Sequence, residues 1–69
     1  MNPIKKIRIE KRIKQEYIAK GMNVTVATVS RWESGEFLPR ADKLPALAKI
    51  LKCNVSELLT EEQEAANGQ

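Results

Sequence analysis

Apolar residues recur at helical spacing along this chain, in short stretches separated by residues that favour turns. Two of these stretches stand close together near the middle of the chain. The first is made by Ile18, Ala19 and Met22, and the second by Val29 and Trp32. Between them lies Asn23, one of the few residues besides glycine that adopts a left-handed backbone at low cost. The pattern predicts a helix over residues 15–22, a tight turn, and a helix over residues 26–34.

The residues in and around the turn between these two helices have side chains that favour it. Val24 is expected to point inward, and Thr25 has the side chain of an N-cap for the second helix. Ala19 is small enough to let two helices cross closely, and Gly35 suits a left-handed cap after residue 34. Two short helices joined in this way form a helix-turn-helix, whose second helix enters the major groove of DNA.

Three further helices are predicted outside this pair. Asn2-Pro3 supplies a capping side chain and a proline at the first helical position. Pro45 is tolerated only near the start of a helix, so residues 41–43 are expected to form an irregular lead-in. Asn54 and Glu57 have the spacing of a capping box. The three helices cover about residues 3–11, 44–51 and 54–59.

The first helix and its connection carry four isoleucines. Ile4, Ile7 and Ile13 are expected to face the core, whereas Ile9 lies off their stripe and is partly exposed. No glycine follows this helix, so Arg12 is expected to take a mildly strained conformation. The fold class is therefore all-α: a compact five-helix bundle that contains a helix-turn-helix.

Length and composition narrow the functional classes. The chain has 69 residues, enough for one small domain, which we place at residues 1–59. Residues 60–69 are acidic and poor in apolar side chains, which predicts a disordered tail. With no histidine and Cys53 as the single cysteine, we expect neither a disulfide nor a zinc site, and Cys53 reads as a small buried hydrophobe.

The sequence offers no set of residues for catalysis. A Ser/His/Asp or Cys/His arrangement is absent, so we expect no enzyme, no cofactor and no small-molecule ligand. No apolar run reaches the length of a membrane span and no signal peptide is visible. The expected location is the cytoplasm of a bacterial or phage-infected cell.

The charge is unevenly distributed. The net charge is +3, but residues 1–40 carry +5 and residues 41–69 carry −2. A basic first half suits a polyanion bound to one face, although a solvated charged surface is an alternative.

A helical wheel separates the two sides of the helix over residues 26–34. One side carries the candidates for contacting bases, which are Val26, Ala27, Ser30 and Arg31. Arg31 can fork onto guanine N7 and O6, and Val26 or Ala27 can touch a thymine methyl group. Val26 and Ala27 could instead be core residues, but Val29 and Trp32 already fill the opposite side.

Other side chains are candidates for contacting phosphates. Gln15 stands at a helix N-terminus, where free amides and the helix dipole favour an anion; capping or simple exposure is the alternative. The complete set of phosphate candidates is Gln15, Thr25, Thr28, Arg8, Lys14 and Arg40.

The chain resembles the DNA-binding domains of the Cro and lambda-repressor type from about Ile4 to Leu59. The resemblance is carried by Gln15, Ile18-Ala19, Met22 to Thr25, Val29 to Glu33, Gly35, Pro39, Leu44, Ala48, Leu51 and residues 54–59. Members of this family have a five-helix bundle around a helix-turn-helix, and most bind operator DNA as symmetric dimers. The resemblance therefore implies a regulator of transcription.

The resemblance also implies roles for single residues. Gln15 and Thr25 would meet the DNA backbone, while Val26, Ala27 and Arg31 would point toward base edges. An ion pair between the first and third helices would join Arg8 to Glu33. The sequence departs from the family pattern at four positions. Asn23 and Lys52 stand where glycine is usual, and Val26 and Ala27 stand where many members have polar side chains.

The sequence as a whole predicts a sequence-specific, double-stranded DNA-binding regulator. We expect a repressor that binds a palindromic operator as a homodimer, with a dimer contact formed from apolar residues not needed by the core. Part of the surface of Val55, Leu58 and Leu59 is expected to close the core, and the rest of it, with Phe37 and Leu38, could form the dimer contact. The alternative is an interaction module of the same fold, antitoxin-like or a co-regulator, that binds a partner protein instead of DNA; the apolar Val26-Ala27 pair and the modest net charge favour it.

Overall fold

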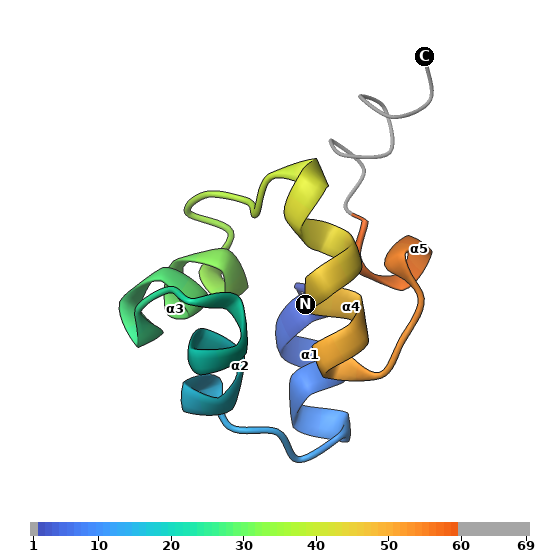
Figure 1. Cartoon of the computed structure of the whole chain (residues 1–69), viewed down its shortest axis with the longest axis horizontal. Helices are drawn as coiled ribbons and strands as arrows, with labels where there is room; N and C mark the ends of the chain where they lie inside the picture. Colours follow the sequence, from blue (N-terminus) through green and yellow to red (C-terminus); the bar gives the residue numbers. More distant parts are fainter. Residues whose placement is uncertain (1, 60–69) are drawn as a thin grey trace.

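Side-chain caps at Asn2, Thr25 and Asn54 set the beginnings of three helices, as the sequence predicts. The computed structural model describes residues 2–59, which form five α-helices and one short 3-10 helix, with no strand among them (Figure 1). The elements are α1 (Pro3–Glu10), α2 (Gln15–Met22), α3 (Val26–Ser34), η1 (Ala41–Lys43), α4 (Leu44–Leu51) and α5 (Val55–Leu58). The predicted all-α class and helical bundle are therefore confirmed, and the predicted tail at residues 60–69 lies outside the described residues.

Three caps are visible in the hydrogen bonds. The Asn2 side chain accepts from the Ile4 amide at 2.9 Å, and the Thr25 hydroxyl accepts from the Thr28 amide at 3.1 Å. At α5, the Asn54 amide donates to the Glu57 carboxylate at 2.7 Å. The capping box predicted from Asn54 and Glu57 is therefore confirmed, and α5 ends at Leu58, with Leu59 as the residue that follows it.

Within residues 2–59, four residues have a left-handed backbone, and each follows a helix. They are Arg12 (φ 57°), Asn23 (φ 58°), Gly35 (φ 81°) and Lys52 (φ 57°). The strained backbone expected at Arg12 and the left-handed conformations expected at Asn23 and Gly35 are confirmed. At the end of α1, the Arg12 amide donates to the Ile9 carbonyl and the Ile13 amide to the Arg8 carbonyl, so the helix stops at Glu10, one residue before the predicted Lys11.

The core lies where α4 packs between the α2–α3 pair and α5 (Figure 1). Its buried apolar side chains are Ile4, Ile18, Ala19, Val29, Trp32, Leu44, Leu47, Ala48, Leu51 and Leu58. Ile7 and Ile13 pack against this core as expected, but they are half-buried at its edge whereas Ile4 is fully buried. The reason is that α1 packs mainly on α3 and α5, so only its first turn is fully covered.

Cys53 also differs from the expectation of a buried hydrophobe. It is half-buried beside the end of α4, although it packs against the core. Burial raises the pKa of the Cys53 thiol, Glu57 adds to the rise and Lys11 opposes it. The neutral thiol is therefore favoured in the folded protein.

Candidate nucleic-acid interface

Helix α3 has one side in the core and one side open to solvent. Val29 and Trp32 are buried on the inner side. The outer side carries the four residues predicted to contact bases, Val26, Ala27, Ser30 and Arg31, and all four are exposed. Val26 is 39% exposed, so Val26 and Ala27 are not core residues in this structure.

A polar hollow of about 370 Å³ adjoins α3 where α1 and α2 meet it. We call it the α1–α2 cup; it is lined by Lys5, Arg8, Lys14, Gln15, Glu16, Ser30, Glu33 and Ser34. Because Ser30 also belongs to the outer side of α3, the cup and that side form one continuous surface. Two carboxylates, Glu16 and Glu33, also line the cup, and Glu33 is paired with Arg8. Lys5, Lys14 and the N-terminus of α2 are the positive groups left to attract an anion.

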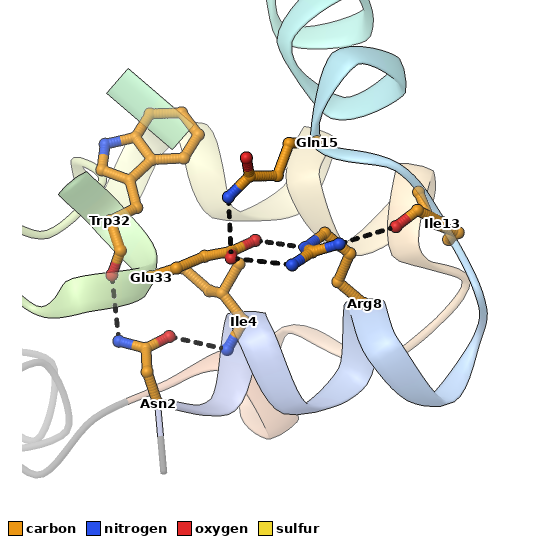
Figure 2. Close-up of polar contacts among 7 residues, drawn as sticks. All are labelled: Asn2, Ile4, Arg8, Ile13, Gln15, Trp32 and Glu33. Carbon is orange, nitrogen blue, oxygen red and sulfur yellow. Dashed lines mark hydrogen bonds and ion pairs between the residues drawn. The ribbon is translucent and has the colours of Figure 1, made fainter. Parts of the chain in front are cut away.

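Glu33 organises the floor of this cup (Figure 2). It is only 6% exposed, and its carboxylate accepts hydrogen bonds from Nε and Nη2 of Arg8, the latter at 3.1 Å. The remaining terminal nitrogen, Arg8 Nη1, donates to the Ile13 carbonyl at 3.0 Å. This bidentate ion pair therefore fixes α1 and the α1–α2 turn against α3.

Gln15 is held by the same carboxylate. Its Nε2 donates to Glu33 Oε1 at 3.1 Å, so Gln15 is neither a cap nor a freely solvated side chain. A glutamine amide group has two N–H donors, and one of them is left for an anion in the cup. Lys14 is the residue before α2, and its side chain does not cap this helix. The first backbone amides of α2 therefore receive no hydrogen-bond acceptor from Lys14.

A second side-chain contact joins α1 to α3, and it comes from the residue that caps the start of α1. Asn2 Nδ2 donates to the Trp32 carbonyl at 3.0 Å, while the oxygen of the same amide caps α1 (Figure 2). The two contacts together hold α3 against α1 at adjacent residues, Trp32 and Glu33. The orientation of the exposed side of α3 is therefore fixed by the N-terminal helix.

The structure brings some of the predicted phosphate candidates together and separates others. Arg8, Lys14 and Gln15 share the cup. Thr25 and Thr28 lie at the start of α3 with their hydroxyl oxygens 3.0 Å apart. Arg40 lies apart from the cup, in the segment after α3, and pairs with Asp42 at 3.8 Å.

Five residues near this surface were missed by sequence reasoning. Lys5, Glu16 and Ser34 line the cup. Glu36 pairs with Arg31, and the guanidinium carbon of Arg31 lies 5.9 Å from the centre of the Phe37 ring. Lys5 precedes Arg8 by one helical turn, which was an available signal, but Glu36 and Phe37 follow the end of α3 and have no helical register with Arg31.

Two other features are absent from the described part of the chain. Within residues 2–59 no cluster of three His, Cys, Asp or Glu side chains is placed to hold a metal ion. The helices in this part of the chain are also too short or too polar to cross a lipid bilayer.

An exposed helix that crosses a second helix beside a cationic cup defines a DNA-binding helix-turn-helix domain. A model of the helix-turn-helix family matches residues 4–58, and the chain belongs to this family. This result confirms the resemblance to Cro- and lambda-repressor-type domains, which are regulators of transcription and not, in general, enzymes.

One known relative is similar over most of this chain. The HTH-type transcriptional activator BcrR of Enterococcus faecalis is 30% identical over 60 residues, which cover 87% of this chain. They cover 29% of BcrR, so the chain matches less than a third of that protein. No solved structure matches the chain.

Proposed function

We propose that the protein binds double-stranded DNA in a sequence-specific way, with α3 in the major groove and the α1–α2 cup on a backbone phosphate. The observation that carries this proposal is the continuity of the cup with the exposed side of α3 through Ser30. Arg31 would fork onto a guanine, and Val26 or Ala27 would touch a thymine methyl group. Lys14, Gln15 and Arg8 would position the domain on the backbone, with the further phosphate contacts supplied by Thr25, Thr28 and Arg40.

We further propose that two copies bind a palindromic operator. A homodimer would place its two α3 helices in successive major grooves, roughly 34–36 Å apart. Exposed Phe37 and half-buried Leu59 are available for the contact between copies. Repression would follow if the bound dimer excluded polymerase from an overlapping promoter, in the cytoplasm where the DNA lies. BcrR is named as an activator, so whether this protein represses or activates would depend on the position of the operator relative to the promoter.

Selection of bound duplexes from a random pool tests this proposal. The wild type is expected to enrich a palindromic consensus, and Arg31→Ala to relax one symmetric position of it. The loss of one bidentate contact would reduce discrimination at that base by about 1–3 kcal/mol. Lys20→Ala removes an exposed cation from α2 and is the matched control, which should retain the consensus. A wild-type protein that enriches nothing above a scrambled pool at low salt would end the sequence-specific proposal.

A second surface favours the protein-interaction alternative. A groove of about 620 Å³ runs along the α1–α2 turn, the outer side of α2 and the end of α4. We call it the α2–α4 groove; it is lined by five cations, Lys11, Arg12, Lys14, Lys20 and Lys52, by one carboxylate, Glu16, and by the apolar side chains of Ile13, Tyr17 and Ile50. Within residues 2–59 none of these five cations forms an ion pair, and Tyr17 is 63% exposed. Gly21 borders the groove beside Tyr17, Lys20 and Ile50, and a Cβ atom there would lie 2.7 Å from Ile50 Cδ1, so a larger residue at this position would displace the Ile50 side chain.

The charge and the apolar floor of the α2–α4 groove fit one kind of partner, a protein segment that carries both acidic and apolar side chains. Chemical-shift mapping with a peptide of glutamate and leucine, and separately with the selected duplex, tests this second function. The peptide is expected to shift the signals of Tyr17 and Ile50, and the duplex those of Val26 and Arg31. If the peptide shifts neither Tyr17 nor Ile50, or the duplex shifts both, the groove is not a site for acidic protein segments.

A further inference from the structure

Arg31 is tied to the segment that follows α3. Its Nε lies 3.2 Å from Glu36 Oε2, and its guanidinium carbon is 5.9 Å from the centre of the Phe37 ring. These contacts hold an exposed side chain, since 54% of the Arg31 side chain and 63% of the Glu36 side chain are open to solvent. The predicted reader of a base therefore has a carboxylate on one edge and an aromatic ring beside it.

The backbone places Glu36 at this position. Gly35 takes a left-handed conformation, and the chain reverses so that the Glu36 amide donates to the Arg31 carbonyl at 3.1 Å. The Ser34 hydroxyl donates to the same carbonyl at 3.1 Å and accepts from the Glu36 amide at 3.3 Å. Glu36 is thus anchored to the residue whose side chain it contacts, and its position follows from the cap of α3.

We propose that Glu36 and Phe37 are positioning residues that determine specificity by fixing the guanidinium of Arg31 for a guanine. Because they act through Arg31, this proposal rests on the DNA-reading role proposed above. A free arginine side chain has many rotamers and reaches the nearest phosphate as readily as a base. A guanidinium held at Nε still presents its terminal edge, where two N–H groups point the same way, to guanine O6 and N7.

The charge of Glu36 gives the proposal a distinctive signature. A carboxylate beside the DNA-facing side of α3 is repelled by phosphates, so it weakens binding to every duplex. The same carboxylate orients Arg31, so it strengthens the preference for one duplex over another. Removing the charge should therefore raise affinity for unrelated DNA and lower discrimination, whereas a merely structural residue would change both affinities together.

Fluorescence anisotropy with two duplexes tests this pair of effects. One is the duplex selected by the wild type. The other is the same duplex with a different base pair at the guanine that Arg31 contacts. Glu36→Gln is expected to bind the replaced duplex more tightly and to reduce the ratio of the two affinities by about two- to fivefold, the range of an exposed ion pair. Phe37→Leu should reduce the ratio without raising general affinity, because it changes no charge.

Asp42→Asn is the matched control, since Asp42 is an exposed carboxylate, with 69% of its side chain open to solvent, that pairs with Arg40. It should change both affinities by the same factor. In the Arg31→Ala background, Glu36→Gln should leave the ratio unchanged. If Glu36→Gln alters the two affinities equally while Arg31→Ala still lowers the ratio, the positioning role is wrong and the DNA-reading role stands. If the wild type prefers neither duplex, both fail.

Discussion

Replacing Glu33 with alanine is expected to lower the melting temperature of the domain by about 10–20 °C, because it leaves Arg8 without its buried partner. The Glu33 side chain is 4% exposed and accepts hydrogen bonds from both Arg8 and Gln15. Breaking a fully buried pair costs about 3–5 kcal/mol. The Arg8 side chain is 16% exposed, so water partly solvates the charge left behind, and we expect about 2–3 kcal/mol here. Thermal denaturation followed by circular dichroism measures the change.

The same variant has a second readout in DNA binding. Without Glu33, the Gln15 amide loses the acceptor that holds it in the cup, so a phosphate contact should weaken. Phosphate contacts carry no sequence information, and affinity should therefore fall by the same factor for selected and scrambled duplexes.

Glu10→Ala is the control for this variant, because Glu10 is an exposed carboxylate on the same helix as Arg8. It should change the free energy of unfolding by no more than about 0.5 kcal/mol. If Glu33→Ala leaves both melting temperature and DNA affinity at wild-type values, the ion pair does not hold α1 on α3.

Local chemistry explains why the middle of the fold could be predicted from the sequence. The bounds of α2 and α3 match the predicted ranges, and three of their four ends carry a local signal, which is the left-handed Asn23, the Thr25 cap or the left-handed Gly35. The end of α1 has no such signal, and it stops where Arg12 turns left-handed. The direction of Ile7 was predictable but its partial exposure was not, because a helical stripe shows which side faces inward and not how far the neighbouring helices extend over it.

The same limit applies to the candidate interface. The exposed and buried sides of α3 follow from helix geometry alone, so the positions of Arg31 and Trp32 were predictable. The partner of Glu33 was implied only by resemblance, because no local pattern connects Arg8 to a residue 25 positions later. The bond from Asn2 to the Trp32 carbonyl and the pairing of Glu36 with Arg31 depend on how separate segments meet, which periodicity does not describe.

The largest loss of stability is expected from Leu47→Ala. Leu47 is fully buried in α4, the helix that packs against both α2 and α5. Truncating a buried leucine to alanine removes about 2–5 kcal/mol through lost burial and the cavity left behind. A domain of this size has a total free energy of unfolding of only about 3–10 kcal/mol, so this one change removes much of it.

Trp32 is the single tryptophan of the chain and is buried in the same core, so its fluorescence reports unfolding directly. Urea titration should show an earlier midpoint for Leu47→Ala with an unchanged slope. Ile9→Ala is the matched control, since Ile9 is 51% exposed and its loss should have little effect. A Leu47→Ala midpoint equal to that of the wild type would mean that α4 is not the centre of the core.

The destabilised Leu47→Ala variant also links the fold to DNA binding. A ligand that binds only the folded state stabilises it, by about 2.7 kcal/mol when its free concentration is a hundred times its Kd. Leu47 is fully buried and would not contact DNA in the proposed complex, so the folded variant should retain the wild-type Kd. The selected duplex at that excess should then restore most of the lost stability, and a scrambled duplex at the same concentration should restore less. Equal recovery with both duplexes would show that the folded domain binds DNA through charge alone.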